Sequence, residues 1–256
     1  MQNPPIFYTV GQIKFNPVLD MQEFVSRIQR DWRSTCPDFS QDTVNEIQIH
    51  LPGPDKAPEV KTISSPRWNF KDAKRSSGFL LGTDSLAFHT TAYKDRDHFI
   101  SALLSGLDVV NSHVGLAYIE SVGVRTLDAV VPQAGEHLSD YLQPGILGIY
   151  GRIEGQLKQS LLQLALDTKS GQVISRVVLL NGTIGIPAEL APISLNLEDR
   201  VSAINGLHVV LDNDCVMKER ASVDLSDLDK RLREVKSQVS TAFHETVSPH
   251  AIKTWS

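Results

Sequence analysis

Apolar side chains recur at intervals of three and four residues in three long stretches of the chain. Residues 18–32, 99–114 and 224–247 each place these side chains along one face of a helix. The third stretch has the most regular stripe, which consists of Leu225, Leu228, Leu232, Val235, Val239 and Phe243. The periodicity therefore predicts three amphipathic helices, and Pro249 predicts where the last one ends.

Alternating polar and apolar residues, or short apolar runs, predict β-strands in most of the remaining chain. A first strand is expected directly after Pro4 and Pro5, ending near Phe15. Residues 52–66 contain four prolines and few large apolar side chains, so we expect a surface loop there. Further strands are predicted at residues 43–51, 67–70, 78–81, 85–93, 116–131, 146–167, 172–186 and 203–218.

The order of these segments argues against a doubly wound parallel sheet, because the predicted helices do not alternate strictly with the strands. We predict an α+β protein of mostly antiparallel β-sheet with helices packed on one face. A short helix within residues 132–145 begins the second of two loosely similar halves, residues 1–131 and 132–256. We expect the two halves to form one compact unit.

Composition and charge narrow the function classes. The net charge of −5 and the pI of about 5.9 provide no overall basic field for nucleic acid or anionic membranes. Cys36 and Cys215 are the only cysteines, which excludes a cysteine-based zinc site and a disulfide framework. Neither a signal-peptide pattern nor an apolar run of about 18 residues occurs, so we expect a soluble cytoplasmic protein without membrane association.

The best candidate for metal chemistry lies near the end of the last predicted strand. His208, Asp212 and Asp214 share one face of that strand, and carboxylate and imidazole groups bind divalent metals. The competing interpretation is a strand end with solvated carboxylates beside Asn213, a common turn composition. We favour the second interpretation and predict no metal and no cofactor. A metal-dependent enzyme acting on nucleic acid or nucleotide is the main alternative function.

Other chemical motifs are weaker. Some nucleases carry an acidic residue two positions before a lysine, and the chain has this pattern in Asp167-Thr168-Lys169. The pattern leads directly into a predicted hairpin turn, and no second acidic ligand is evident on a neighbouring strand. Neither a Gly-x-Ser-x-Gly nucleophile motif nor a phosphate-binding loop occurs, so no catalytic residue is predicted. Lys71, Lys74 and Arg75 form a small basic cluster, which leaves a nucleic-acid-binding protein as a third function.

Four segments of the chain resemble the TIGR04255 family of sporadically distributed prokaryotic proteins. They are residues 3–15, with the Asn-Pro-Pro opening; Arg67-Trp68-Asn69-Phe70 together with 84–93; 122–128; and Leu211-Asp212-Asn213-Asp214 with the final helix, His244 and Trp255. In the third segment Thr126 and Asp128 replace the Tyr and Asn usual in that family. The resemblance implies a setting in defence or toxin–antitoxin operons, and it implies no general activity.

We therefore expect a non-enzymatic protein-interaction module, in the form of an antitoxin-like or anti-phage defence-operon accessory subunit. Its partner would be a protein from the same operon, with homo-oligomerisation as a further option. We expect the 52–66 loop to bind this partner together with Arg67 and Trp68, with Trp68 as the aromatic anchor. Two alternatives remain: the loop is disordered, since Lys56, Glu59 and Lys61 keep it soluble, and Trp68 lies in the hydrophobic core.

Overall fold

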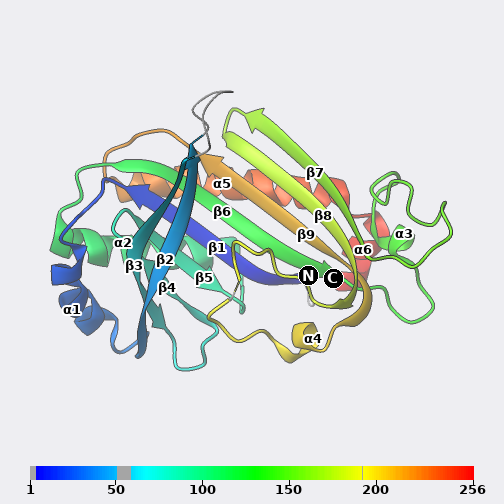
Figure 1. Cartoon of the computed structure of the whole chain (residues 1–256), viewed down its shortest axis with the longest axis horizontal. Helices are drawn as coiled ribbons and strands as arrows, with labels where there is room; N and C mark the ends of the chain where they lie inside the picture. The colour runs from blue at the N-terminus through cyan, green and yellow to red at the C-terminus, as the bar shows by residue number, and fades with distance from the viewer. Residues whose placement is uncertain (1–3, 51–58, 192) are drawn as a thin grey trace.

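The computed structural model describes residues 4–50, 59–191 and 193–256. These residues form one antiparallel sheet of nine strands, in the order β2-β3-β4-β5-β1-β6-β9-β8-β7 (Figure 1). The strands are β1 (Ile6–Phe15), β2 (Asp38–His50), β3 (Glu59–Lys71), β4 (Ser77–Leu81), β5 (Ser85–Thr90), β6 (Ile119–Val130), β7 (Gln159–Thr168), β8 (Gly171–Thr183) and β9 (Asn205–Met217).

Three long helices pack on one face of this sheet: α1 (Met21–Trp32), α2 (Arg96–Val114) and α5 (Leu225–Thr246). The short helices α3 (Leu138–Tyr141) and α6 (Pro249–Trp255) pack beside the end of α5 on the same face, whereas α4 (Asp199–Ser202) lies on the other face. The predicted α+β fold with mostly antiparallel sheet is confirmed. The halves 1–131 and 132–256 contribute to the same sheet and meet where β6 pairs with β9.

The alternation of side chains along each strand separates two chemically different faces. On β1, Ile13 and Phe15 face the helices and belong to the main core, whereas Tyr8 and Gln12 face the other way. We call the side without the long helices the open face. The same alternation places Trp68 of β3 toward the helices and Arg67 on the open face.

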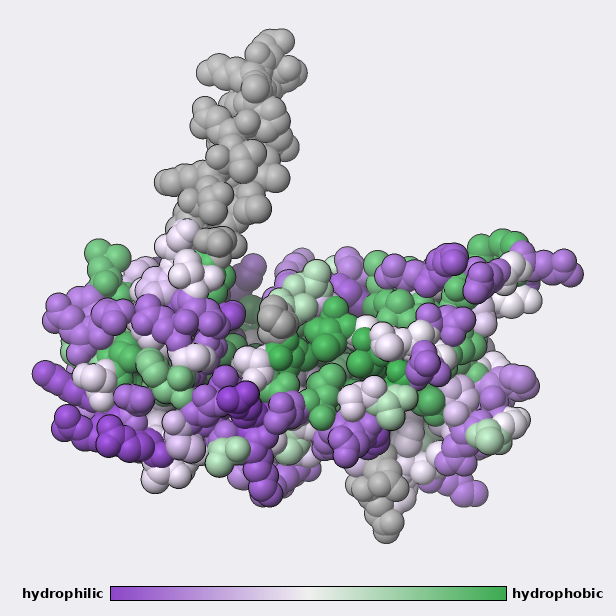
Figure 2. All heavy atoms as spheres, turned by 60° about the horizontal axis from the view of Figure 1, so that its bottom comes forward, coloured by the Kyte–Doolittle hydropathy of each residue, from purple (hydrophilic) through white to green (hydrophobic). Residues whose placement is uncertain are grey.

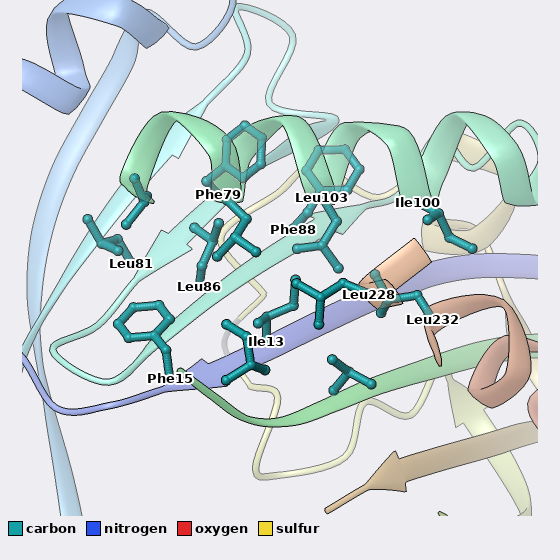
Figure 3. Close-up of a cluster of buried hydrophobic side chains, with 14 of the residues drawn as sticks. Ile13, Phe15, Phe79, Leu81, Leu86, Phe88, Ile100, Leu103, Leu228 and Leu232 are labelled. Carbon is teal, nitrogen blue, oxygen red and sulfur yellow. The ribbon is translucent and has the colours of Figure 1, made fainter. Parts of the chain in front are cut away.

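Large apolar side chains from the strands and helices fill the space between the two layers (Figure 3). Phe79 and Phe88 of the sheet point toward Leu103 of α2, and α5 contributes Leu228 and Leu232. Two glycines allow this close approach. A Cβ atom at Gly11 would lie 2.9 Å from Cδ2 of Leu103, and one at Gly106 would overlap the Phe79 ring. The core therefore depends on small residues at the closest helix–sheet contacts.

Local signals in the sequence explain where the long helices begin and end. The Asp95 carboxylate accepts a hydrogen bond from the His98 amide at the start of α2, and Asp224 accepts two amide hydrogen bonds at the start of α5. Gly115 adopts the left-handed conformation that ends α2, with φ of 69°. No helix in the described part of the chain has the length and apolar character needed to span a membrane.

One ionisable pair is buried between α5 and the sheet. Asp128 on β6 and Lys236 on α5 are both buried, and the Lys236 Nζ atom lies 5.3 Å from the centre of the Tyr93 ring. Burial raises the pKa of Asp128 to about 7, although Lys236 and the Thr126 hydroxyl oppose that shift. Burial likewise lowers the pKa of Lys236. Thr126 and Asp128, the two departures from the family pattern, therefore lie inside the helix–sheet interface.

Two segment predictions were wrong in part. Residues 146–158 form turns rather than the start of a long strand, and β7 begins only at Gln159. Residues 59–66 belong to β3, not to a loop, while 51–58 fall outside the described residues. Because β4 pairs only with residues 68–71 of β3, residues 59–67 pair with β2 alone. This part of β2 and β3 is a two-stranded ribbon, which is marginally stable in isolation.

Substituting Leu232 by alanine should lower the free energy of unfolding by about 2–5 kcal/mol, because the side chain is fully buried under α5. Chemical denaturation of the two proteins measures this difference. The exposed Leu19 provides the matched control, since Leu19→Ala should change stability by less than about 0.5 kcal/mol. Equal losses for both variants would contradict the core assignment.

The Asp128 carboxyl should make stability fall as pH rises. The pKa of this carboxyl is about 7 in the folded protein and about 3.9 in an unfolded chain. The carboxyl therefore makes its full contribution to stability below about pH 4, and this contribution is lost as the pH rises toward 7. Relative to Asp128→Asn, the native protein should therefore lose stability across that window. Urea unfolding at several pH values tests this, with the exposed Asp108→Asn as control. A constant difference between the native protein and Asp128→Asn would contradict the raised pKa.

Candidate binding cleft on the open face of the sheet

A cleft of about 350 Å³ lies on the open face, above the central strands. Its floor comes from β1, β5, β6 and β9, one wall comes from β3, and the opposite wall comes from the segment that links β8 to β9. The polar and charged residues that line it are Tyr8, Gln12, Asp42, Arg67, His89, Arg125, Glu189, Ser194 and Asp214. Apolar lining residues include Val10, Leu80, Ala87, Leu190, Ile193 and Val216.

The wall between β8 and β9 is formed by the described residues 184–191 and 193–204, which we call the strap. Its buried Leu195 and Val201 pack against Tyr8, Leu127 and Val210 of the sheet. Figure 2, in which the side of α4 is turned forward, shows apolar side chains gathered over the middle of this face between hydrophilic margins. The strap thus crosses the open face as a packed layer of its own.

Hydrogen bonds fasten the strap to the turn between β3 and β4. The Asn196 amide N–H donates to the Arg75 carbonyl at 2.7 Å, and its side-chain Nδ2 donates to the Lys74 carbonyl at 3.0 Å. The Thr91 hydroxyl donates to the Asn196 carbonyl at 2.7 Å. These contacts join residues more than a hundred positions apart in the sequence and fix one end of the cleft wall.

A buried ionic network fastens the middle of the strap. Arg125 on β6 donates to both carboxylate oxygens of Asp212 on β9, at 2.6 and 2.7 Å, and Arg176 on β8 donates to the same carboxylate at 3.1 Å. Arg125 also donates to Glu189 of the strap at 2.8 Å. Burial alone would lower the pKa of Arg125, but its bonds to Asp212 and Glu189 raise it. Arg125 therefore remains charged and links sheet and strap.

A second polar pair lies deeper in the cleft. The Tyr8 hydroxyl and the His89 Nδ1 atom are 3.1 Å apart, and both residues are almost completely buried. Burial, with Arg67 and Lys71 nearby, lowers the pKa of His89 to about 3, so the imidazole is neutral at physiological pH. Burial also raises the pKa of Tyr8, which keeps the phenol protonated. Donation from the phenol to Nδ1 leaves the proton of the neutral ring on Nε2.

Three buried polar atoms that belong to residues lining the cleft have no hydrogen-bond partner among the described residues. They are Nε of Arg67, Nε2 of His89 and Oγ of Ser194. Leaving a buried donor unpaired costs about 1–3 kcal/mol, so such atoms are rare in folded proteins. Five further atoms of this kind belong to Thr9, Trp68, Asn69, His208 and Asn213, which do not line the cleft. The three at the cleft are hydrogen-bond donors that a bound group with acceptor atoms would satisfy.

One carboxylate that lines the cleft, Asp214, is partly removed from water. Burial raises its pKa and the nearby Arg125 opposes that shift. The charges lining the cleft are mixed, with Arg67 and Arg125 against Asp42, Glu189 and Asp214. This balance does not favour a strongly charged ligand of either sign, and it suits a neutral polar group.

The alternative metal site is not assembled. His208, Asp212 and Asp214 do share the open face, as the sequence pattern indicates, but His208 lies four residues from Asp212 along β9 and its Nδ1 contacts the Gly206 carbonyl. Asp212 is fully buried against two arginines, so the interpretation as a solvated strand end is wrong for this residue. No group of three or more potential ligands occurs in residues 4–50, 59–191 and 193–256.

The two expected partner-binding residues, Trp68 and Arg67, lie on opposite faces of the sheet. Trp68 is fully buried in the main core, so the expectation of an exposed aromatic anchor is wrong and its alternative, a core tryptophan, is correct. The alternation of β3 turns this side chain toward the helices. Arg67, its neighbour, lies on the open face and lines the cleft, where its Nη2 is 3.5 Å from Asp42. Arg67 therefore remains a candidate binding residue.

The small basic cluster at the β3–β4 turn does not present a free basic surface. Lys71 is buried with its Nζ 3.9 Å from Asp38, and Arg75 donates to the same carboxylate at 2.5 Å. Lys74 offers its carbonyl to the strap. Because two of the three cations share one acidic partner, the cluster gives little support to nucleic-acid binding.

Sequence reasoning did not identify Tyr8, His89, Arg125 or Ser194 as site residues. Each lies in an ordinary strand or loop, and no local motif connects them. The alternation of side chains along the strands could have identified His89 and Arg125. A histidine or arginine that points to the polar face of a central strand is buried and requires a polar partner. A comparison of the chain with models of known protein families finds no match, and neither does a comparison with curated proteins. Inference about function therefore rests on the cleft itself.

Replacing Asp212 by asparagine should destabilise the protein by about 3–5 kcal/mol, because the change leaves two arginines without their shared buried carboxylate. Thermal and urea denaturation measure the loss. Glu120→Gln is the matched control, because it breaks an exposed pair with Arg220 and should cost less than about 1 kcal/mol. Native-like stability of Asp212→Asn would show that the network does not hold the strap.

Proposed function

We propose that this protein is a non-enzymatic protein-interaction module and that its cleft binds an uncharged segment of a partner protein. The observation that carries the proposal is the group of three unpaired buried polar atoms, on Arg67, His89 and Ser194, around one cavity. Each can donate a hydrogen bond, and peptide carbonyl groups are the most abundant neutral acceptors that a partner offers.

The size and lining of the cleft support this choice of ligand. A volume of about 350 Å³ suits a few residues of chain rather than a folded surface. Apolar side chains such as Leu190 and Ile193 of the strap, and Leu80 of β4, offer contacts for a partner's side chains. Polar groups that fix the main chain, surrounded by apolar walls, are the usual composition of a peptide site.

Two observations favour binding over catalysis. The neutral His89 and the protonated Tyr8 are held far from the pKa values useful for acid–base chemistry near pH 7. The buried Asp212 carboxylate is occupied by two arginines. The resemblance to the TIGR04255 family supports a search for the partner among products of the same operon, in an antitoxin-like or defence setting.

Peptides selected from a random library on the native protein should lose at least about 10-fold in affinity when Arg67 is changed to methionine or Ser194 to alanine. Neither change should lower stability by more than about 1 kcal/mol, because Ser194 Oγ has no partner and Arg67 loses only its half-exposed ion pair with Asp42. Isothermal titration and thermal denaturation provide the two readouts.

The matched control is Arg33→Met, since Arg33 is an exposed arginine at the end of α1, outside the cleft. It should leave peptide affinity unchanged. Selected peptides that bind both cleft variants as tightly as the native protein would contradict the proposed function, and so would failure of the library to yield any binder.

A further inference from the structure

The outermost strand β7 has an unpaired backbone edge. It pairs with β8 along its whole length and with no other strand in the described part of the chain (Figure 1). The β7–β8 register runs from Gln159 to Thr168 without a bulge. A regular edge of ten residues is about 34 Å long and leaves a row of N–H and C=O groups free for another strand.

The side chains of β7 are unusually apolar for an exposed strand. Leu161, Leu162, Leu164 and Leu166 are 55%, 46%, 52% and 48% exposed. Register with β8 puts Leu162 beside the buried Val177 and Leu166 beside the buried Val173, so Leu162, Leu164 and Leu166 lie on the helix face. There they continue the apolar surface beyond the region that α5 covers.

The usual protection of an edge strand is missing. Proteins normally place charged residues, prolines or bulges on such edges to prevent pairing with other chains. Residues 159–166 contain no charged residue and no proline. The opposite edge of the sheet differs, because β2 carries the carboxylates of Asp38 and Asp42. The absence of protection is therefore specific to β7.

We propose that a second copy of this chain binds to β7, with the two β7 strands paired antiparallel about a two-fold axis at Leu164. In this register Leu164 faces its own counterpart and Leu162 faces Leu166 of the second copy. Six leucines then form one continuous row on the helix face, and the two sheets become a single sheet. Such an interface is isologous, which is the commonest symmetry of dimers.

The distribution of charge is what selects a second copy as the occupant. In the Leu164-centred register, Lys158 faces Ser170, Asp167 faces Leu161 and Lys169 faces Gln159, so no two like charges are opposed. Residues 159–166, the first eight of the strand, are uncharged, which matches another neutral strand better than a charged partner. The leucine row adds apolar burial to the backbone hydrogen bonds.

The first test is the oligomeric state of the full chain. Sedimentation velocity should give a particle of twice 28.3 kDa for the native protein. Leu164→Lys should raise the dimer dissociation constant at least about 10-fold, because it opposes two like charges in place of two leucines. Leu19→Lys is the matched control, since Leu19 is 95% exposed and lies outside the sheet. It should leave the dimer intact.

The second test fixes the register and does not depend on a destabilising variant. In this pairing the Cα atoms of the two Leu164 residues are about 4.5–5.5 Å apart, which suits a disulfide. Leu164→Cys should cross-link to itself under mild oxidation, whereas Leu162→Cys and Leu166→Cys should cross-link only when mixed. Cys36 and Cys215 are buried and do not compete. A native protein that is monomeric at about 100 μM, or a dimer unaffected by Leu164→Lys and without these cross-links, would overturn the proposal.

Discussion

The contact between Arg125 and Asp212 determines the form of the open face. It joins β6 to β9, the two strands through which the N-terminal and C-terminal parts of the chain enter one sheet. The same guanidinium reaches Glu189, so a buried ion pair within the sheet also holds the strap above it. The desolvation cost of such charges is large and is offset only when every group is bonded. Here Arg125 donates to both carboxylate oxygens of Asp212 and Arg176 donates to one of them, so both oxygens of this buried carboxylate are bonded.

The two faces of the sheet therefore obey different constraints. On the helix face, aromatic and aliphatic packing leaves one buried ionisable pair, Asp128 with Lys236. On the open face, ionic and polar contacts predominate. Three unpaired polar atoms belong to residues around the cleft, while Thr9, Trp68 and Asn213 have one each on the helix face. Unpaired buried groups lower stability, and folded proteins retain them chiefly where they serve binding or catalysis. The cost of keeping Arg67, His89 and Ser194 in this state is consistent with a binding site.

Periodicity alone predicted much of the fold. The stripe that contains Leu232 predicted α5, and alternation placed His208, Asp212 and Asp214 on one face of β9. The failures have physical causes. Trp68 was predicted as a partner-binding anchor because aromatic side chains dominate binding hot spots, with a core position as the alternative, and the alternation of β3 places it in the core. The strap has no period, since its apolar residues pack on the sheet individually, so its position was not predictable. The partners Arg125 and Asp212 are 87 residues apart and no local pattern joins them.

The central claim is that the open-face cleft receives a segment of another protein, and a crystal structure of the protein with a library-selected peptide tests it most directly. We expect electron density for the peptide between β3 and the strap, with peptide oxygen atoms within about 3.2 Å of His89 Nε2 and Arg67 Nε. A peptide bound elsewhere, with those two atoms still unpaired, would contradict it.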